Sequence, residues 1–281
     1  MSHFVDSVTI ITGGGGGMGL AVARLLARED ALLLADVNGD RLAAARDELA
    51  DTALRYCDMT IDVTDARAVE AMFDEAAHLG VLRAVVHTAG VSPSMGDAEY
   101  IMRTNAIGTV NVNEAFHARA GDGAAIVNVA SMAAHMLPDE IIPTAAFPLA
   151  TEDPEEFLTQ MLAACEIAPP EARPGLSYAI GKSFVKWYSS AQAERFNARG
   201  QRIVSVSPGS VDTMMGRLEE QAGAGAMVAD AAVPRWGTAE EMAALMVFCV
   251  GPTAGYLTGT DILNDGGVIA SMRERARKAA G

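Results

Sequence analysis

Short, continuously apolar runs alternate with amphipathic stretches along most of the chain. Such runs suit strands that are covered on both faces, and their alternation with helices predicts a parallel, doubly wound α/β sheet with right-handed crossovers. The expected strands are residues 8–12, 31–36, 53–59, 82–88, 124–130, 202–207 and 260–265. The expected helices are residues 18–29, 39–50, 65–79, 98–120, 177–199 and 238–250.

The alternation stops between Met132 and Leu176, where seven of the eleven prolines lie. A structureless loop of this length would be unusual inside one domain. The run Asp153-Pro154-Glu155-Glu156 has the pattern of an N-cap, a first-turn proline and a capping-box glutamate. An apolar stripe follows at helical spacing: Phe157, Leu158, Met161, Leu162 and Cys165. We therefore expect a single domain, 1–281, with a partly helical insertion at 132–176.

Composition narrows the choice of partners and compartment. The 281 residues are half hydrophobic and carry a net charge of −15, which argues against nucleic acid or an anionic membrane as a partner. No apolar stretch is long enough to span a bilayer. The cysteines form neither a pair spacing nor a metal cluster, and three reduced thiols indicate a cytoplasmic protein.

The run TGGGGGMG follows the first expected strand and opens the first helix. Glycines let backbone N–H groups approach a pyrophosphate, and the helix N-terminus favours its negative charge. The residues expected to do this are Gly13, Gly17, Met18 and Gly19. A flexible strand–helix turn is the alternative interpretation.

Asp36 ends the second expected strand, 17 residues after Gly19. A carboxylate there can bind the adenosine ribose hydroxyls and would repel a 2′-phosphate. Val37 and Asn38 follow without a cation, so NAD is favoured over NADP; a helix cap or turn is the alternative role for Asp36. The pair Asp62-Val63 after the third strand could contact the adenine ring or could start the next helix.

Tyr178 and Lys182 are four residues apart in SYAIGKSF and would share one helix face. A cation about 4 Å from a phenol is worth roughly 4 kcal/mol at an effective dielectric near 20, or about three pKa units. Lys182 could thus make Tyr178 a proton donor and acceptor near neutrality. Most pairs at this spacing are surface residues, so the pattern alone is weak.

Two other positions strengthen the hypothesis. Ser131 follows the fifth strand, where its hydroxyl could hold a substrate oxygen, although it could also serve as an N-cap. Asn105 lies inside the long fourth helix, where an amide is mildly unfavourable. It could hold a water that passes protons to Lys182, or it could cap a kink.

Taken together, these residues resemble the short-chain dehydrogenase/reductase family from end to end. The matching segments are TGGGGGMG, Asp36, Asp62-Val63, HTAG (87–90), Asn105, NVAS (128–131), Tyr178 with Lys182, SPGSVDT (207–213) and NDGG (264–267). The resemblance implies a seven-stranded Rossmann sheet and a catalytic tetrad of Asn105, Ser131, Tyr178 and Lys182. It also implies that Tyr178 and Lys182 contact the cofactor, with Lys182 on the nicotinamide ribose. Further cofactor contacts would come from Ala89, Gly90, Pro208, Gly209, Val211 and Thr213.

The chain departs from the family pattern at two places. His87-Thr88 stands where the family usually has two asparagines, and Thr88 can still hydrogen-bond. Ser131 and Tyr178 are 47 residues apart, far more than in most members. A similar insertion, with an ASMAAH start, is found in the bacterial three-alpha-hydroxysteroid dehydrogenase/carbonyl reductase subgroup, which the chain resembles.

Apolar side chains are frequent in the two variable segments. Residues 214–236 contribute Met214, Met215, Leu218, Met227 and Val228, and the insertion contributes Met136, Leu137, Ile141, Ile142 and Phe147. They suit a bulky hydrophobic substrate, or they pack against each other or a partner subunit. We expect the stripe of the insertion to roof the substrate cleft, because Ser131 and Tyr178 tether its ends, with a subunit contact as the alternative.

The sequence therefore predicts an NAD(H)-dependent oxidoreductase that interconverts a secondary alcohol and a ketone on a hydrophobic, steroid-like or alicyclic substrate. The alternatives are an NADPH-dependent carbonyl reductase and a non-catalytic dinucleotide-binding regulatory protein. No metal is expected. By resemblance to the family, a homodimer or homotetramer is expected.

Overall fold

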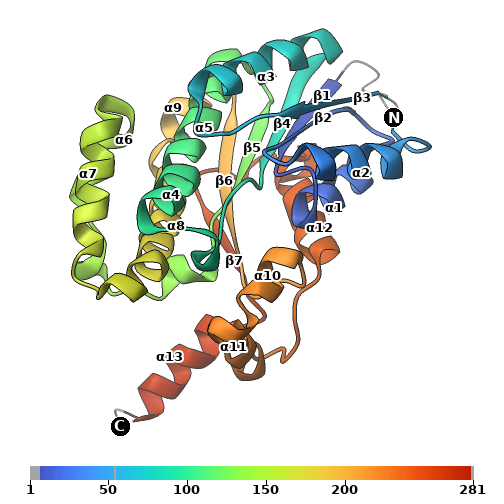
Figure 1. Cartoon of the computed structure of the whole chain (residues 1–281). Coiled ribbons are helices and arrows are strands. Elements are labelled where there is room, and N and C mark those ends of the chain that lie inside the picture. Colours follow the sequence, from blue (N-terminus) through green and yellow to red (C-terminus); the bar gives the residue numbers. More distant parts are fainter. Residues whose placement is uncertain (1–6, 54, 280–281) are drawn as a thin grey trace.

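The computed structural model describes residues 7–53 and 55–279 as one α/β domain around a seven-stranded sheet (Figure 1). All paired strands run parallel, in the order β3-β2-β1-β4-β5-β6-β7. The strands are β1 (Ser7–Thr12), β2 (Ala31–Asp36), β3 (Tyr56–Thr60), β4 (Val81–His87), β5 (Ala125–Val129), β6 (Arg202–Pro208) and β7 (Asp261–Asn264). The order reverses direction between β1 and β4, which makes a crevice for a ligand at the carboxyl ends of these strands.

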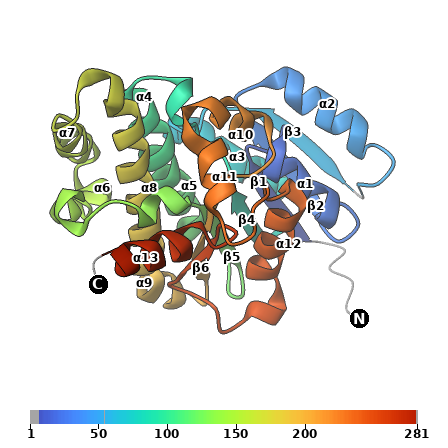
Figure 2. The same ribbon diagram turned by 90° about the horizontal axis from the view of Figure 1, so that it is seen from below.

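Helices cover both faces of the sheet, and the two views agree on this arrangement (Figures 1 and 2). One face carries α1 (Gly17–Leu26), α2 (Gly39–Leu49) and α12 (Ala239–Val250). The other carries α3 (Ala66–Leu79), α4 (Ala98–Met102), α5 (Gly108–Arg119), α8 (Arg173–Ala191) and α9 (Ala193–Asn197). Neighbouring residues of a strand point to opposite faces of the sheet. Ile10 packs against the helices that include α3 and α8, and Ile11 against those that include α1 and α12.

The predicted fold class and the seven strands are confirmed, with differences at their ends. The third strand begins at Tyr56 rather than at Ala53, and Leu54 lies outside the described residues. The expected helix 98–120 is three pieces, because a π-helical segment, Arg103–Ile107, joins α4 to α5. The expected helix 177–199 starts earlier, at Arg173 with a proline in its first turn, and its C-terminal part is the separate helix α9.

The segment 132–176 is ordered. It contains α6 (Leu149–Glu152), α7 (Pro154–Cys165) and 3₁₀ turns at Met132–His135, Asp139–Ile141, Thr144–Ala146 and Pro170–Ala172. The Asp153 carboxylate accepts the Glu156 N–H at 3.1 Å, so the predicted N-cap is present. The Glu156 carboxylate, however, accepts from the Gln160 amide at 2.8 Å instead of closing a capping box.

The apolar stripe of α7 is buried inside the chain. Phe157 and Met161 are fully buried, and the Phe157 ring lies 4.8 Å from that of Phe184 on α8. Contacts with α4 and α8 fix α7 outermost on that side of the molecule in both views (Figures 1 and 2). We expected this stripe to roof the cleft. It packs instead against the outer face of α4 and α8, which offers an apolar surface. Only the ends of the segment, Met132–Met136 and Gly175, reach the cleft described below.

After β6 the chain forms α10 (Met214–Leu218), a π-helical segment at Glu220–Ala224 and α11 (Gly225–Asp230). A 3₁₀ turn at Pro252–Ala254 precedes β7, and α13 (Val268–Ala279) follows it. Val268 and Ile269 on α13 pack with Met132, while the rest of α13 extends away from the body (Figure 1). None of the helices in the described part of the chain is long and apolar enough to cross a membrane.

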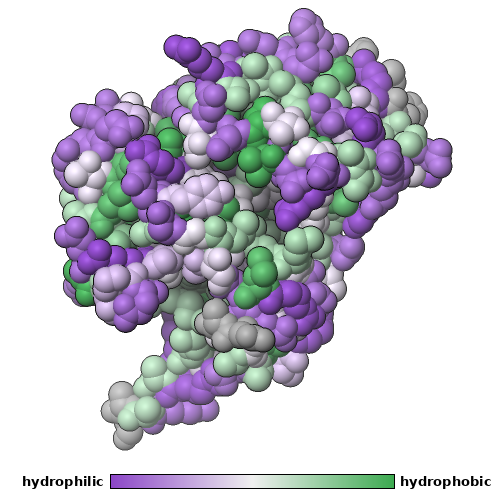
Figure 3. All heavy atoms as spheres, viewed as in Figure 1, coloured by the Kyte–Doolittle hydropathy of each residue, from purple (hydrophilic) through white to green (hydrophobic). Residues whose placement is uncertain are grey.

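The surface seen in Figure 3 is mostly hydrophilic, and hydrophobic side chains border a hollow near its centre. An apolar border around a hollow, on a face that is otherwise polar, is typical of a small-molecule site.

Candidate active site

Two connected pockets lie at the carboxyl ends of the strands. The first, called the glycine pocket here, has a volume of about 270 Å³ and is lined by the glycine loop, the ends of β2 and β3 and the segment after β4. The second, called the apolar pocket, has a volume of about 410 Å³ and is lined by Ser131, Tyr178, Lys182 and many apolar side chains. Both are lined by Met18, Thr88, Gly90, Val91, Thr213 and Met215, so they form one cleft.

Backbone geometry explains two glycines of the loop. Gly13 and Gly17 have φ values of 67° and 51°, which side-chain-bearing residues rarely adopt. A Cβ on Gly13 would also lie 2.9 Å from the Ala89 nitrogen. Both glycines line the glycine pocket with Met18. Gly19 does not line it; a Cβ there would lie 2.4 Å from the Gly13 carbonyl oxygen, so Gly19 serves close packing within the loop.

Asp36 lines the glycine pocket at the end of β2. Its Oδ2 accepts the Gly15 N–H at 3.1 Å, and its Oδ1 accepts the Asn38 N–H at 3.0 Å. The carboxylate thus shapes the glycine loop while facing the pocket. Asn38, not Asp36, caps α2.

Arg41, in the first turn of α2, lines the same pocket, and sequence reasoning missed it. The space where a Cβ on Gly15 would stand is 2.8 Å from the Arg41 Cβ and 3.0 Å from Asp36 Oδ2. The Arg41 guanidinium donates to the Met214 sulfur at 3.4 Å, across the mouth of the pocket. The helical spacing from the N-cap Asn38 to Arg41 is the signal that could have revealed this cation.

Asp62 and Val63 also line the glycine pocket. Asp62 Oδ1 accepts from both the backbone N–H and the hydroxyl of Thr64, each at 2.8 Å. The cap of α3 is Asp65, which accepts the Arg67 and Ala68 N–H groups. Asp62 therefore does not start the helix, and its place at the pocket is the arrangement expected for an adenine contact.

Tyr178 and Ser131 meet in the apolar pocket. The Ser131 Oγ accepts the Ala133 N–H at 3.2 Å, so it does cap the following turn. Burial raises the pKa of Tyr178, the nearby Ser131 hydroxyl opposes this rise, and the Glu219 carboxylate adds to it. The expectation that Lys182 brings this pKa close to neutrality was wrong for the protein by itself, because burial of the phenol is the largest influence and raises the pKa.

Lys182 is buried beside Tyr178, with its Nζ 5.8 Å from the centre of the phenol ring. Nζ donates to the Val129 carbonyl at 2.7 Å, which fixes the side chain against the end of β5. Burial lowers the pKa of Lys182 to about 8. A Cβ on Gly90 would lie 3.5 Å from Nζ, so glycine there keeps the way from the ammonium to the cleft open.

Asn105 lies in the π-helical segment and is buried. Its Oδ1 accepts the Val91 N–H and its Nδ2 donates to the Val91 carbonyl, both at 2.9 Å. The amide thus clamps the loop after β4, and the hypothesis that Asn105 also holds a water stays a prediction. Its backbone carbonyl accepts the Thr109 hydroxyl at 2.8 Å.

His87, one of the departures from the family pattern, is buried at the end of β4. The Thr109 hydroxyl donates to Asn105, so its oxygen can accept from His87 Nε2, 3.1 Å away. Nδ1 then accepts from the Thr12 hydroxyl at 2.7 Å. Burial, aided by Lys182, lowers the pKa of His87 to about 3, so a neutral imidazole links Thr12 at the end of β1 to Thr109 on α5. Thr88 donates to the Thr12 carbonyl at 2.7 Å, as its hydroxyl allowed.

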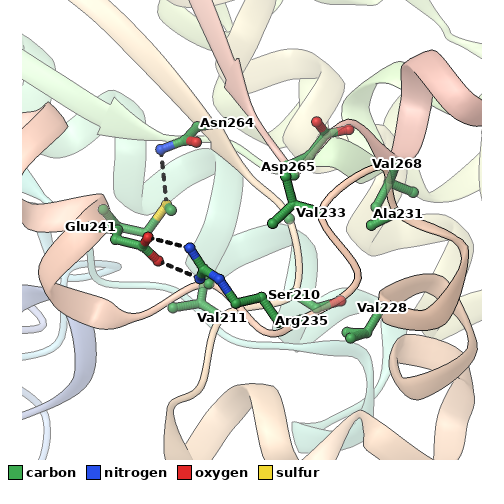
Figure 4. A pocket seen from close by; sticks show the side chains of 14 residues that line it. Ser210, Val211, Val228, Ala231, Val233, Arg235, Glu241, Asn264, Asp265 and Val268 are labelled. Atoms are coloured by element: carbon green, nitrogen blue, oxygen red, sulfur yellow. Dashed lines mark hydrogen bonds and ion pairs between the residues drawn. The ribbon is translucent and has the colours of Figure 1, made fainter.

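The remaining predicted residues fall into place around the two pockets. Pro208, Gly209, Val211 and Thr213 line the apolar pocket, Ala89 lines the glycine pocket, and Gly90 lines both. Behind Gly209–Val211 lies a smaller cavity of about 180 Å³, drawn in Figure 4. There Arg235 points to Glu241 and is paired with it at 2.6 Å, and Val228, Val233 and Val268 supply apolar walls. Within the described residues no cluster of His, Cys, Asp and Glu could hold a metal ion.

Comparison with known proteins agrees with this geometry. The family model for short chain dehydrogenase matches residues 7–144, and the model for Enoyl-(Acyl carrier protein) reductase matches residues 142–269. A short-chain dehydrogenase/reductase, bsc3, from Alternaria brassicicola is 30% identical over 94% of this chain and 96% of its own.

The chain belongs to the short-chain dehydrogenase/reductase family. It is also 27% identical to 3beta-hydroxysteroid dehydrogenase 2 of Eggerthella lenta, over 92% of this chain and 93% of that protein. Among solved structures, a short chain dehydrogenase from Burkholderia cenocepacia in complex with NADP superposes with a TM-score of 0.73 at 24% identity, covering 92% of this chain and 96% of the other. Membership makes the chain an oxidoreductase that binds a nicotinamide dinucleotide, and it leaves the choice of cofactor and substrate to be argued from the site.

Proposed function

We propose that this protein is an NAD(H)-dependent oxidoreductase that interconverts a secondary alcohol and a ketone on a hydrophobic, alicyclic or steroid-like substrate. The observation that carries the proposal is the meeting of Ser131, Tyr178 and Lys182 in an apolar pocket that opens into the glycine pocket. The hydroxysteroid dehydrogenase among its relatives supports an alicyclic alcohol. The insertion and the ASMAAH sequence support the three-alpha-hydroxysteroid subgroup in particular.

The glycine pocket fits a dinucleotide. Its wall includes backbone at Gly13, Gly16 and Gly17, and α1 begins there, so that its N-terminus can favour the negative charge of a pyrophosphate. Asp36 would bind the adenosine ribose, and Asp62 with Val63 would contact the adenine. Pro208, Gly209, Val211 and Thr213 would hold the nicotinamide end with Ala89 and Gly90.

A bound nicotinamide would supply the acceptor or donor of the hydride. The chain itself moves the proton. In reduction, the Tyr178 hydroxyl gives its proton to the carbonyl oxygen while the Ser131 hydroxyl stabilises the charge on that oxygen. In oxidation the phenolate takes the proton of the alcohol. Lys182, next to the ring, stabilises the phenolate and replenishes the proton, and Asn105 positions the loop that carries Gly90 and Val91.

Arg41 supports one alternative, an NADPH-dependent carbonyl reductase. A guanidinium beside the ribose position could pair with a 2′-phosphate, and Asp36 would oppose it. We favour NAD because both oxygens of Asp36 are fixed toward the pocket by backbone N–H groups, whereas Arg41 is drawn toward Met214. Fluorescence titration with NADH and NADPH decides, and tighter binding of NADPH by the wild type would reverse the assignment.

The second alternative is a dinucleotide-binding regulatory protein without catalysis. A protein of that kind has no need to keep a buried lysine, a serine and a tyrosine together at one pocket. The test is a screen of secondary alcohols and ketones with NAD(H), followed by the absorbance of the reduced nicotinamide. Turnover of at least one alicyclic alcohol supports the enzyme, and binding of the cofactor without any turnover supports the regulator.

The remaining parts of the proposal concern location and assembly. We propose a cytoplasmic protein that assembles as a homodimer or homotetramer and has neither nucleic acid nor membrane as a partner, in keeping with a net charge of −15. The start of the insertion, Met132–Met136, would cap the substrate, while α7 would present its exposed face to solvent or to another subunit. Sedimentation of the purified protein measures the assembly.

A further inference from the structure

Glu219 is the one carboxylate among the described residues that line the apolar pocket. It follows α10 at the mouth of the cleft, where the other residues of the segment that line the pocket are uncharged. Glu219 differs in this from the carboxylates that form ion pairs on the outer surface, such as Glu220 with Arg217. A partly buried carboxylate beside an apolar cavity acts on whatever enters that cavity.

The hydrogen bonds of Glu219 leave half of the carboxylate available. Oε1 accepts the backbone N–H of Ser94 at 3.0 Å, which joins the segment after β6 to the loop after β4. Among the described residues, no donor bonds to Oε2. One oxygen is therefore anchored and the other can accept a hydrogen bond from a ligand.

The field of Glu219 reaches the reacting group, because the carboxylate contributes to the raised pKa of Tyr178. A ligand whose oxygen bonds to Tyr178 must then lie within the same field. Among the described residues that line the pocket, Lys182 is the only cation, and it is buried and bonded to the Val129 carbonyl at the inner end. Arg217 stacks on the lining residue Trp236 but is already paired with Asp212 and Glu220. An anionic group at the mouth of the pocket would therefore be repelled by Glu219.

We propose that Glu219 determines substrate specificity: it rejects carboxylate- or phosphate-bearing substrates and accepts a hydrogen bond from a second hydroxyl of an uncharged alcohol or ketone. This inference rests on the proposed function and adds a substrate class to it. Repulsion between like charges across a partly solvated pocket corresponds to about a tenfold or greater loss of kcat/KM. A hydroxyl bonded to a carboxylate adds about tenfold in the other direction.

The experiment uses the full-length protein with NAD and four alcohols. They are cyclohexanol and its derivatives that carry a hydroxyl, a carboxamide or a carboxylate at ring position 4. The carboxamide and the carboxylate have nearly the same shape, so their ratio isolates charge. The wild type should prefer the diol to cyclohexanol and should oxidise the carboxamide at least about tenfold better than the carboxylate. This comparison needs no variant and decides the charge effect even if substitutions disturb folding.

The variants are Glu219→Gln and, as a control with the same charge change, Glu220→Gln, which is exposed and outside the pocket. Glu219→Gln should remove most of the difference between carboxamide and carboxylate, and the rise of the oxidation rate with pH should begin at lower pH, because Glu219 no longer raises the pKa of Tyr178. Glu220→Gln should leave both unchanged. If the bond to Ser94 serves only the structure, Glu219→Gln should lower the stability and should change neither the carboxamide-to-carboxylate ratio nor the pH–rate profile.

Two results would overturn the inference, and they differ in what else they remove. Oxidation of cyclohexanol with equal kcat/KM for the carboxamide and the carboxylate, in the wild type, rejects the role of Glu219 while the proposed function stands. No turnover of any of the four alcohols, together with none in the wider alcohol and ketone screen, rejects the proposed function and the inference with it.

Discussion

The two ends of the cleft are lined by different kinds of residues. At the glycine pocket, the walls are backbone and short side chains that directly follow strands β1, β2, β3 and β4. At the apolar pocket, many of the walls are methionines and other apolar side chains from the long segments before α8 and after β6. The first end follows from local sequence order, whereas the second depends on how distant segments pack. This difference separates what the family shares from what this chain has of its own.

The helix α7 of the insertion belongs to neither end, although residues near both ends of the insertion line the apolar pocket. This helix rests on α8 and α4 through Phe157. Replacing Phe157 by Ala should lower the free energy of unfolding by about 3–5 kcal/mol, because a fully buried ring is lost. The control is Ile167→Ala, since Ile167 is 68% exposed and should matter little. Denaturant unfolding measures the stability of both variants. A folded Phe157→Ala enzyme whose KM rises for bulky substrates alone would show that α7 contributes to substrate binding.

The glycine pocket can be tested through its packing. Gly19→Ala should cost about 1–3 kcal/mol of stability, because its Cβ would overlap the Gly13 carbonyl oxygen at 2.4 Å. Gly16→Ala is the matched control, since a Cβ there meets nothing within 4 Å. Thermal unfolding of the two variants should differ clearly. Equal melting temperatures would mean that the loop relaxes and that Gly19 is not required for packing.

The polar wall of the glycine pocket sets the cofactor. Asp36→Ala should weaken NAD binding about tenfold and reduce the discrimination against NADP, since the carboxylate would bind the ribose hydroxyls. Asp40→Ala, an exposed position in the first turn of α2, is the control. Fluorescence titration with both reduced cofactors gives the dissociation constants. If Asp36→Ala still discriminates equally between NAD and NADP, Arg41 and not Asp36 would determine the choice of cofactor.

The apolar end should show itself in the pH dependence. Because burial raises the pKa of Tyr178, the phenol is protonated at neutral pH. Reduction, which needs the phenol, should therefore be retained at neutral pH and decline in alkali. Oxidation, which needs the phenolate, should rise as the pH rises. Steady-state rates in both directions across this range test the sign, and an oxidation rate that falls with rising pH would exclude Tyr178 as the base.

The sequence predicted the cofactor end more completely than the substrate end. The alternation of apolar runs located seven strands, and the glycine run and the end of the second strand located the glycine loop and Asp36. Arg41 was missed because it reaches the pocket through a turn of helix rather than through adjacency in sequence. Glu219 was missed because its contact with Ser94 spans 125 residues.

Packing explains the errors of interpretation as well. The stripe of α7 was identified correctly as apolar and buried, yet its burial site was wrong, since periodicity tells which face is buried and not what covers it. The expected effect of Lys182 on Tyr178 considered charge alone and omitted burial, which changes the pKa of both groups. The π-helical segment at Asn105 has no sequence signal that we can identify.

The most direct test of the account compares Tyr178→Phe with the wild type in a single turnover. The protein is loaded with NADH and mixed with an alicyclic ketone that the screen has identified as a substrate, and the loss of reduced nicotinamide is followed. The wild type should oxidise the cofactor in a burst. Tyr178→Phe should bind NADH with nearly the same affinity and react about a thousandfold more slowly, because the proton donor is gone. A burst of wild-type rate in Tyr178→Phe would contradict the central claim.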